Sequence, residues 1–260
     1  MKTLVVANQK GGVGKTSTLV HLAFDFLERG LKVVVIDLDT QANASYTLQS
    51  FRSNLVASEL FAAVPSSAWP QTATDFTDPN TQRMTLIGSD IGLANLEKKM
   101  SLAEAGANFR EAIKTVEGQG FDVCLIDTAP SLGVTMAAAL LAADYVLSPI
   151  ELEAYSIQGI KQMVTTIAHL RKANHKLKFL GMVPSKVDAR NPRHARHLEE
   201  LERAYPQLMI PTGVGLRSSI ADALASRVPV WKIRKTAARK ATQEIRALAA
   251  HVFEKMEMTQ

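Results

Sequence analysis

Short apolar runs alternate with longer stretches of helical spacing along most of the chain. Residues 3–7 (TLVVA) and 32–36 (KVVVI) are compact apolar runs rich in β-branched residues, which is typical of buried strands. Between them, residues 16–29 carry apolar side chains at helical spacing, and Gly30 follows as a plausible C-cap. Strand, loop, helix and strand in this order predict a βαβ unit, and therefore a parallel sheet.

The same alternation continues toward the end of the chain. Further strands are predicted at residues 84–88, 121–126, 145–150, 179–183 and 208–211. Further helices are predicted at residues 95–117 (broken near Gly106), 132–143, 155–173, 192–204, 217–225 and 237–256. Residues 65–82 are rich in turn-forming and polar residues, which indicates a surface excursion. We therefore expect one doubly wound α/β domain over residues 1–260, with a mostly parallel sheet flanked by helices and a ligand at the carboxyl ends of the strands.

The composition indicates the class of protein and the compartment in which it works. Of the 260 residues 47% are hydrophobic and 21% charged, which is typical of a globular, soluble protein. A single cysteine, Cys124, excludes an internal disulfide and favours a reducing cytoplasm. The apolar run at the N-terminus is too short for a signal peptide, and no run of 18 apolar residues predicts a membrane span.

The stretch NQKGGVGKTST, residues 8–18, follows the first predicted strand and opens the first predicted helix. It approaches the phosphate-loop pattern G-x-x-x-x-G-K-[ST], but Gln9 stands at the first glycine position and a second lysine, Lys10, follows it. Glycines let backbone N–H groups approach an anion, and a helix N-terminus adds its dipole. The predicted nucleotide-binding residues are Lys10, Gly11, Gly12, Val13, Gly14, Lys15, Thr16 and Ser17. Lys15 would reach the β- and γ-phosphates of ATP, and the Thr16 hydroxyl would bind Mg²⁺.

Acidic residues follow two of the predicted strands. Asp127 comes directly after FDVCLI, where a Walker-B aspartate belongs, and Asp37 and Asp39 follow KVVVI. A phosphoryl-transfer site needs such groups to hold the metal and its waters. The predicted metal-site residues are therefore Thr16, Asp37 and Asp127.

Taken together, KGGVGKTS, DLDTQ and LIDTAPSLG resemble the ParA/MinD family of deviant Walker-A ATPases over nearly the whole chain. In that family Gln9 is ordinary and the first lysine of the loop is the distinguishing one. The resemblance implies that Lys10 crosses a dimer interface to the ATP of the other subunit, so that ATP binding and homodimer formation are coupled. It also implies that Asp39 positions the attacking water and that Asp127 supports Mg²⁺ through water. Lys10, Lys15 and Asp39 are then the expected catalytic residues.

Other implications of the resemblance concern the two switch segments. Asp37 lies with Asp39 in the first, where Thr40 replaces the usual proline and leaves the turn less rigid. Residues 128–133 (TAPSLG) would form the second.

Several branches of the family can be tested against the sequence. Iron–sulfur carriers need more cysteines than Cys124, and the related tyrosine kinases end in a tyrosine cluster, whereas the last tyrosine here is Tyr205. MinD-like proteins end in a basic amphipathic membrane helix. The polar face of the C-terminal segment here mixes acidic and basic residues, so we do not expect membrane binding.

Positive charge gathers late in the chain. Residues 216–246 hold eight basic and two acidic residues, a surplus of six that exceeds the net charge of +5 for the whole chain. Clustered positive charge suits sequence-independent binding to DNA phosphates. The predicted DNA-binding residues are Arg217, Arg234, Lys235, Arg239 and Lys240, of which Arg217 also resembles a DNA-contacting arginine of the family. A second basic group comprises Lys186, Arg190, Arg193 and Arg196.

These observations favour a DNA-partition ATPase. Its ATP-bound dimer would bind nonspecific double-stranded DNA at the nucleoid, and a ParB-type centromere-binding partner would stimulate slow, Mg²⁺-dependent hydrolysis. The phosphate-loop strand begins near residue 3, so we expect no N-terminal helix-turn-helix domain. Two alternatives stay open: a MinD-like or cargo-positioning ATPase acting on a membrane or a protein cargo, and a nucleotide-gated scaffold with negligible hydrolysis.

Overall fold

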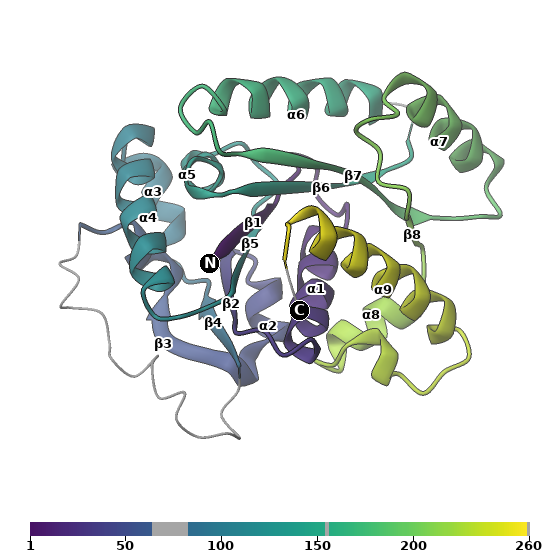
Figure 1. Cartoon of the computed structure of the whole chain (residues 1–260), viewed down its shortest axis with the longest axis horizontal. Helices are drawn as coiled ribbons and strands as arrows, with labels where there is room; N and C mark the ends of the chain where they lie inside the picture. Colours follow the sequence, from purple (N-terminus) through teal and green to yellow (C-terminus); the bar gives the residue numbers. More distant parts are fainter. Residues whose placement is uncertain (64–82, 154–155, 259–260) are drawn as a thin grey trace.

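A computed structural model describes residues 1–63, 83–153 and 156–258 of the chain. Its centre is an eight-stranded sheet in which neighbouring strands pair in parallel, in the order β3-β4-β2-β5-β1-β6-β7-β8 (Figure 1). The strands are β1 (Lys2–Val6), β2 (Val33–Leu38), β3 (Arg52–Val56), β4 (Met84–Gly88), β5 (Val123–Thr128), β6 (Tyr145–Glu151), β7 (Lys178–Val187) and β8 (Val214–Gly215). The predicted doubly wound α/β fold is thus confirmed. The surface excursion predicted at 65–82 lies outside the described residues.

Helices cover both faces of this sheet. They are α1 (Lys15–Glu28), α2 (Asn43–Thr47), α3 (Leu93–Lys99), α4 (Leu102–Glu117), α5 (Val134–Ala142), α6 (Ser156–Leu170), α7 (Pro192–Ala204), α8 (Ser218–Ala225) and α9 (Ala238–Lys255). Short 3-10 turns lie at η1 (Gln49–Phe51), η2 (Ala57–Phe61) and η5 (Val230–Lys232). None of the helices in the described ranges is long and apolar enough to cross a membrane.

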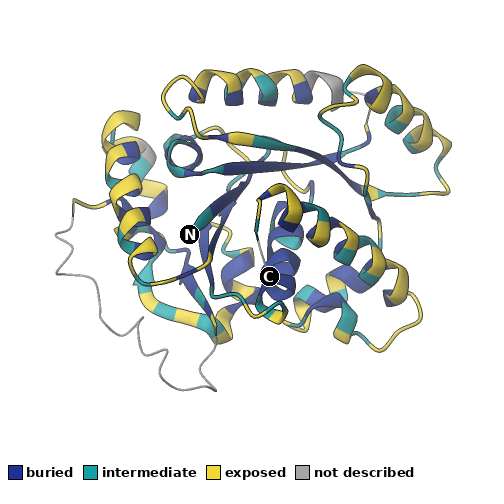
Figure 2. Ribbon diagram, in the orientation of Figure 1, coloured by how far each residue is buried: buried dark blue, intermediate teal, exposed yellow. Residues whose placement is uncertain are grey.

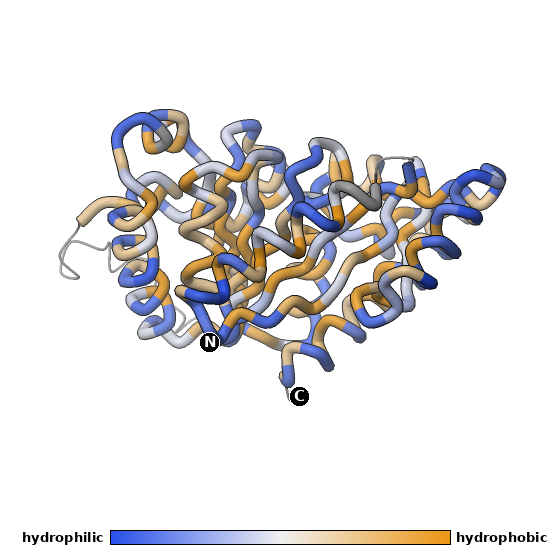
Figure 3. Tube along the Cα trace, turned by 90° about the horizontal axis from the view of Figure 1, so that it is seen from above, coloured by the Kyte–Doolittle hydropathy of each residue, from blue (hydrophilic) through white to orange (hydrophobic). Residues whose placement is uncertain are grey.

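The core forms two layers because successive strand residues face opposite sides of the sheet. Leu4 and Val6 of β1 pack with apolar residues of α1, α8 and α9, whereas Val5 packs with those of α4, α5 and α6. Figure 2 shows the central strands almost wholly buried, the edge strand β3 partly exposed, and most other exposed residues on the outer sides of the helices. Figure 3, seen from above, shows the same division as apolar strands between helices with hydrophilic outer faces.

This strand order places the site. The strands β2 to β5 all lie on one side of β1, and after β5 the chain crosses to β6, β7 and β8 on the other side. Ligands of open α/β sheets bind at the carboxyl ends of the strands beside such a reversal. Val6 is in register with Asp127, and Asp127 with Asp37, so the phosphate-loop strand ends beside both acidic strand ends.

The helix predicted at 95–117 is divided at a different point from the one expected. The division falls at Met100 and Ser101, where the Ser101 side chain accepts a hydrogen bond from the Glu104 N–H and caps α4. Gly106 lies inside α4, and a Cβ there would stand 3.1 Å from Cδ1 of Leu141 on the neighbouring α5. This glycine therefore serves close packing rather than a break.

Two further details differ from the prediction. Of the strand expected at 208–211, only an isolated bridge between Met182 and Met209 is present, and the edge strand β8 lies later, at Val214–Gly215. Both α2 and β3 were not predicted, because α2 has only five residues and β3 is a partly exposed edge strand without a strong apolar run.

Candidate nucleotide and DNA sites

The loop between β1 and α1 adopts a conformation that only glycine accepts easily at two positions. Gly12 has a φ of 77° and Gly14 a φ of 91°, in the left-handed region. A Cβ on Gly14 would stand 2.7 Å from Oγ of Ser185 and 3.2 Å from Oγ of Ser17. The loop therefore depends on glycine for both its backbone angles and its contact with β7.

The start of the loop is fixed to β6. The Asn8 side chain donates to Ser148 Oγ at 3.2 Å and to the Pro149 carbonyl at 2.8 Å, and its oxygen accepts the Lys10 N–H at 2.8 Å. Gly14 caps α1 without a side-chain hydrogen bond, and the first turn of α1 holds no acidic residue. The first N–H groups of α1 are thus left for an anion.

Behind the loop, one hydroxyl and two charged groups meet. Thr16 Oγ1 donates to Asp127 Oδ2 at 2.6 Å, and the Lys15 ammonium group donates to the Lys10 carbonyl at 3.2 Å. Burial lowers the pKa of Lys15, although Asp127 and Asp39 oppose that shift. Burial, together with the neighbouring negative charges of Asp37 and Asp39, raises the pKa of Asp127 to about 8. A cation beside Asp127 would relieve this repulsion.

The two other acidic residues differ in their surroundings. Asp37 is fully buried, and its carboxylate accepts hydrogen bonds from the Ser45 N–H at 2.8 Å, the Ser45 hydroxyl at 2.7 Å and the Asp39 N–H at 3.1 Å. Burial raises its pKa. Asp39 accepts the Gln41 N–H at 2.9 Å and faces the cavity in front of the phosphate loop. Asp37 therefore holds α2 against the end of β2, whereas Asp39 is accessible to a ligand.

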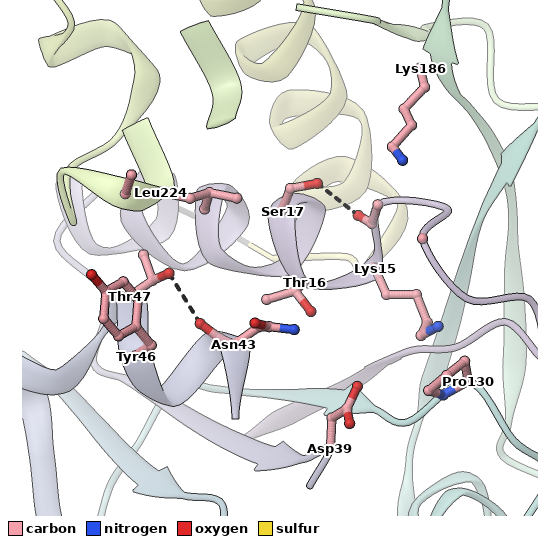
Figure 4. A pocket seen from close by; sticks show the side chains of 13 residues that line it. Lys15, Thr16, Ser17, Asp39, Asn43, Tyr46, Thr47, Pro130, Lys186 and Leu224 are labelled. Carbon is pink, nitrogen blue, oxygen red and sulfur yellow. Dashed lines mark hydrogen bonds between the residues drawn. The ribbon is translucent and has the colours of Figure 1, made fainter. Parts of the chain in front are cut away.

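A cavity of about 400 Å³ lies in front of the loop (Figure 4). Its lining brings together predicted and unpredicted residues: Gly12, Gly14, Lys15, Thr16, Ser17, Asp39, Asn43, Tyr46, Thr47, Pro130, Lys186, Leu224 and Ala225. Asn43, Tyr46 and Thr47 belong to α2, the element that the sequence pattern missed. Lys186 lies three residues beyond the strand predicted at 179–183, because β7 extends to Val187, and the sequence had placed it only in a basic group.

Lys10 turns away from this cavity and toward β6. Its ammonium group lies 3.1 Å from Glu151 and 2.5 Å from Glu153, and 47% of its side chain is exposed. The two carboxylates raise its pKa, although burial, the largest single influence, opposes them. The structure thus separates the two loop lysines: Lys15 is buried and lines the cavity, whereas Lys10 is half exposed and lies beside it.

The basic C-terminal segment is partly neutralised by its own chain. Arg217 forms a two-pronged pair with Glu244, at 2.9 Å and 2.5 Å, and Lys235 pairs with Asp222 at 2.6 Å. Arg246 pairs with Asp25 and Glu28 and stacks on Trp231.

Three of the five residues predicted to bind DNA remain exposed and make no ion pair within the described part of the chain: Arg234, Arg239 and Lys240. These three residues are therefore the better candidates for contact with DNA, whereas Arg217 and Lys235 are already paired with carboxylates of the same chain.

Comparison with known proteins identifies the family. An AAA domain family matches residues 1–179. Protein IncC of Escherichia coli is 70% identical over 260 residues, covering 100% of this chain and 71% of IncC. The chromosome partitioning protein ParA of Caulobacter vibrioides is 31% identical over 194 residues, covering 74% of this chain and 72% of ParA. The chain belongs to the ParA family of partition ATPases.

Solved structures agree with this assignment at the level of the fold. The McdA–ATP complex of Cyanothece has a TM-score of 0.80 at 23% identity, covering 100% of this chain and 98% of McdA. Cobyrinic acid a,c-diamide synthase of Mycobacterium smegmatis, solved with an ATP analogue and magnesium, has a TM-score of 0.75 at 26% identity, covering 98% of this chain and 94% of the synthase. The ParA-family fold is thus shared with proteins of different tasks, and the site itself has to carry the functional argument.

Proposed function

We propose that this ParA-family ATPase binds Mg²⁺–ATP in the cavity in front of its phosphate loop and uses it to partition DNA. The arrangement of Lys15, Thr16 and Asp127 at the carboxyl edge of the sheet carries the proposal. A glycine loop with open N–H groups, a lysine and a metal-binding hydroxyl are the parts that phosphoryl transfer requires.

The donor set suits magnesium. Asp127 Oδ1 is buried and has no hydrogen-bond partner among the described residues, while Oδ2 accepts from Thr16. The described residues form no group of three or more His, Cys, Asp or Glu side chains that could hold a metal ion by themselves. Magnesium commonly uses one or two protein groups together with waters and phosphates, so Thr16 and Asp127 fit it. Bound Mg²⁺ would neutralise charge on the phosphates, and Asp37 would support the site by fixing the segment that carries Asp39.

The catalytic contribution of the chain would come from positioning. Asp39 would orient the attacking water, since its carboxylate faces the cavity and is held by the Gln41 N–H. Lys15 would hold the β- and γ-phosphates. Because these groups mainly position the reactants and stabilise charge, slow turnover that a ParB-type partner accelerates is expected.

A sandwich dimer would complete the site. The Lys10 ammonium group does not line the cavity of its own chain and is half exposed beside it. This placement supports the proposal that Lys10 contacts the ATP of a second subunit. Only the nucleotide-bound dimer would then combine two basic surfaces, each with Arg234, Arg239 and Lys240, for nonspecific DNA at the nucleoid.

Steady-state ATP hydrolysis tests the proposed chemistry. Asp39→Ala should reduce kcat by about 100-fold or more, the size of effect seen when a group that assists proton transfer or positions a water is lost. Glu111→Ala, which removes an exposed carboxylate from α4, is the matched control and should leave turnover unchanged. Unchanged turnover in Asp39→Ala would show that Asp39 is not catalytic.

DNA binding tests the partition role separately. A DNA fragment of arbitrary sequence should be bound in the presence of ATP and released with ADP or without nucleotide. Nucleotide-independent binding, or none, would contradict the partition proposal and favour a different cargo.

A further inference from the structure

A third lysine approaches the phosphate loop from the far side of the cavity. Lys186 lies at the carboxyl end of β7 and has a φ of 54°, a left-handed conformation that is uncommon for a residue other than glycine. Its Nζ lies 3.8 Å from the position that a Cβ on Gly12 would occupy. In Figure 4 the ammonium group of Lys186 points from the rim toward the space in front of Ser17 and Lys15.

Glu151 at the end of β6 links this lysine to Lys10. One carboxylate oxygen of Glu151 lies 3.1 Å from Lys186 Nζ, and the other lies 3.1 Å from Lys10 Nζ. Only 17% of the Glu151 side chain is exposed, while 45% of the Lys186 side chain is exposed. Burial alone would raise the pKa of Glu151, but hydrogen bonds from Lys10 and Lys186 bring it below its ordinary range. Glu151 thus stays charged and holds both lysines beside the loop.

The position of the Lys186 ammonium group suits binding of a polyphosphate chain. An ammonium group near Gly12 faces the same space as the open N–H groups of α1, where a chain of phosphates carries several negative charges. Lysine binds phosphate as a mobile point charge on a flexible stem, so Lys186 can exchange one anionic partner for another. The exposed fraction of its side chain leaves room for that exchange.

We propose that Lys186 is a further nucleotide-binding residue. Glu151 holds the Lys186 side chain beside Gly12 in the absence of nucleotide, and when ATP binds, its phosphate groups replace Glu151 as the partner of Lys186. The inference rests on the proposed ATP-binding function and extends it. Lys186 then acts in the same subunit as the nucleotide, in contrast to Lys10. The sequence had placed Lys186 in a basic group with Arg190, Arg193 and Arg196, but of these four residues Lys186 is the one that lines the cavity.

Nucleotide affinity tests this assignment. Binding of a fluorescent ATP analogue would be measured for the unsubstituted chain, Lys186→Met, Lys186→Arg and the control Lys176→Met, which removes an exposed lysine before β7. Lys186→Met should weaken binding about tenfold or more, the size expected for loss of one charge-assisted hydrogen bond. Lys186→Arg should retain most of the affinity, and Lys176→Met all of it. The thermal midpoint of each variant without nucleotide shows whether it is folded.

A base-free competitor separates phosphate contact from other effects. Inorganic tripolyphosphate should displace the analogue from the unsubstituted chain, and Lys186→Met should weaken its binding by a similar factor. The difference between the two proteins should shrink as KCl is raised. Equal affinity of folded Lys186→Met and the unsubstituted chain for ATP would overturn this inference alone, as would a loss confined to DNA binding. Failure of the unsubstituted chain to bind ATP would overturn the proposed function, and this inference with it.

Discussion

At the scale of single residues, the site follows from motifs wherever the motif has fixed spacing. Lys15 and Thr16 lie where the loop pattern predicts, and Asp127 meets Thr16 because β1 and β5 are adjacent. Lys186 and Tyr46 could not be predicted in the same way. They approach the cavity from distant elements, so only the packing of those elements reveals them.

His21 joins the phosphate-loop helix to the C-terminal part of the chain. Its Nδ1 lies 2.7 Å from the Ser17 carbonyl, and its Nε2 lies 3.2 Å from the Val230 nitrogen. The side chain is fully buried. These partners require a neutral ring that donates from Nδ1 and accepts at Nε2.

We predict that His21 makes the fold sensitive to acid. Burial lowers the pKa of His21 from 6.5 to about 4, so between these values the unfolded chain binds more protons than the folded one. The contribution of His21 to stability is therefore present above pH 6.5 and is lost as pH falls to about 4. The loss amounts to about 3 kcal/mol.

Denaturant unfolding between pH 4 and pH 7 measures this effect. His21→Gln should be less stable than the unsubstituted chain at pH 7 but should lose less stability on acidification. Parallel curves for the two proteins would show that His21 does not cause the acid sensitivity.

At the scale of elements, long periodic helices and buried strands could be read from the sequence, and short or exposed ones could not. The position of the division between α3 and α4 shows why. The S-x-x-E sequence at Ser101 is a capping pattern and marks the true start of α4, whereas Gly106, a residue type that often breaks helices, lies inside α4. The glycine is retained in α4 because Leu141 of α5 packs against it.

Two glycine substitutions should have opposite effects on stability. Gly106→Leu should destabilise the protein by about 1–3 kcal/mol, since the added side chain has no space against α5. Gly159→Ala in α6 is the matched control, because a Cβ there meets nothing within 4 Å. It should raise stability by about 0.5–1 kcal/mol through helix propensity. Denaturant midpoints measure both, and a stable Gly106→Leu variant would contradict the packing argument.

At the scale of the whole molecule, nucleotide and dimer formation should be linked through Lys10. Lys10→Ala should still bind ATP, because Lys15 and the loop backbone are intact, but it should lose ATP-dependent dimerisation. Size-exclusion chromatography coupled to light scattering, with ATP and Asp39→Ala to slow hydrolysis, measures the assembly. A normal dimer with normal turnover in Lys10→Ala would refute the shared-ATP proposal.

DNA affinity should depend on salt through the exposed basic residues near the start of α9. Arg239→Glu and Lys240→Glu should each weaken DNA binding at all sequences, and each should reduce the slope of log affinity against log salt by about one. Lys176→Glu makes the same charge change on the loop between α6 and β7 and should have little effect. Equal effects of all three would indicate a dependence on net charge alone.

The strand order also constrains how the protein can be made. The strand β1 lies between β5 and β6, which begin at Val123 and Tyr145, so both of its neighbouring strands are absent until more than a hundred residues after β1 have been synthesised. Helix α1 likewise packs against α9, which is synthesised much later. Contacts between such distant segments form slowly, and until they form the exposed apolar edges of β1 can pair with other chains and aggregate. The phosphate loop precedes all of these partners in the chain and is therefore among the last parts of this domain to gain its final shape during synthesis.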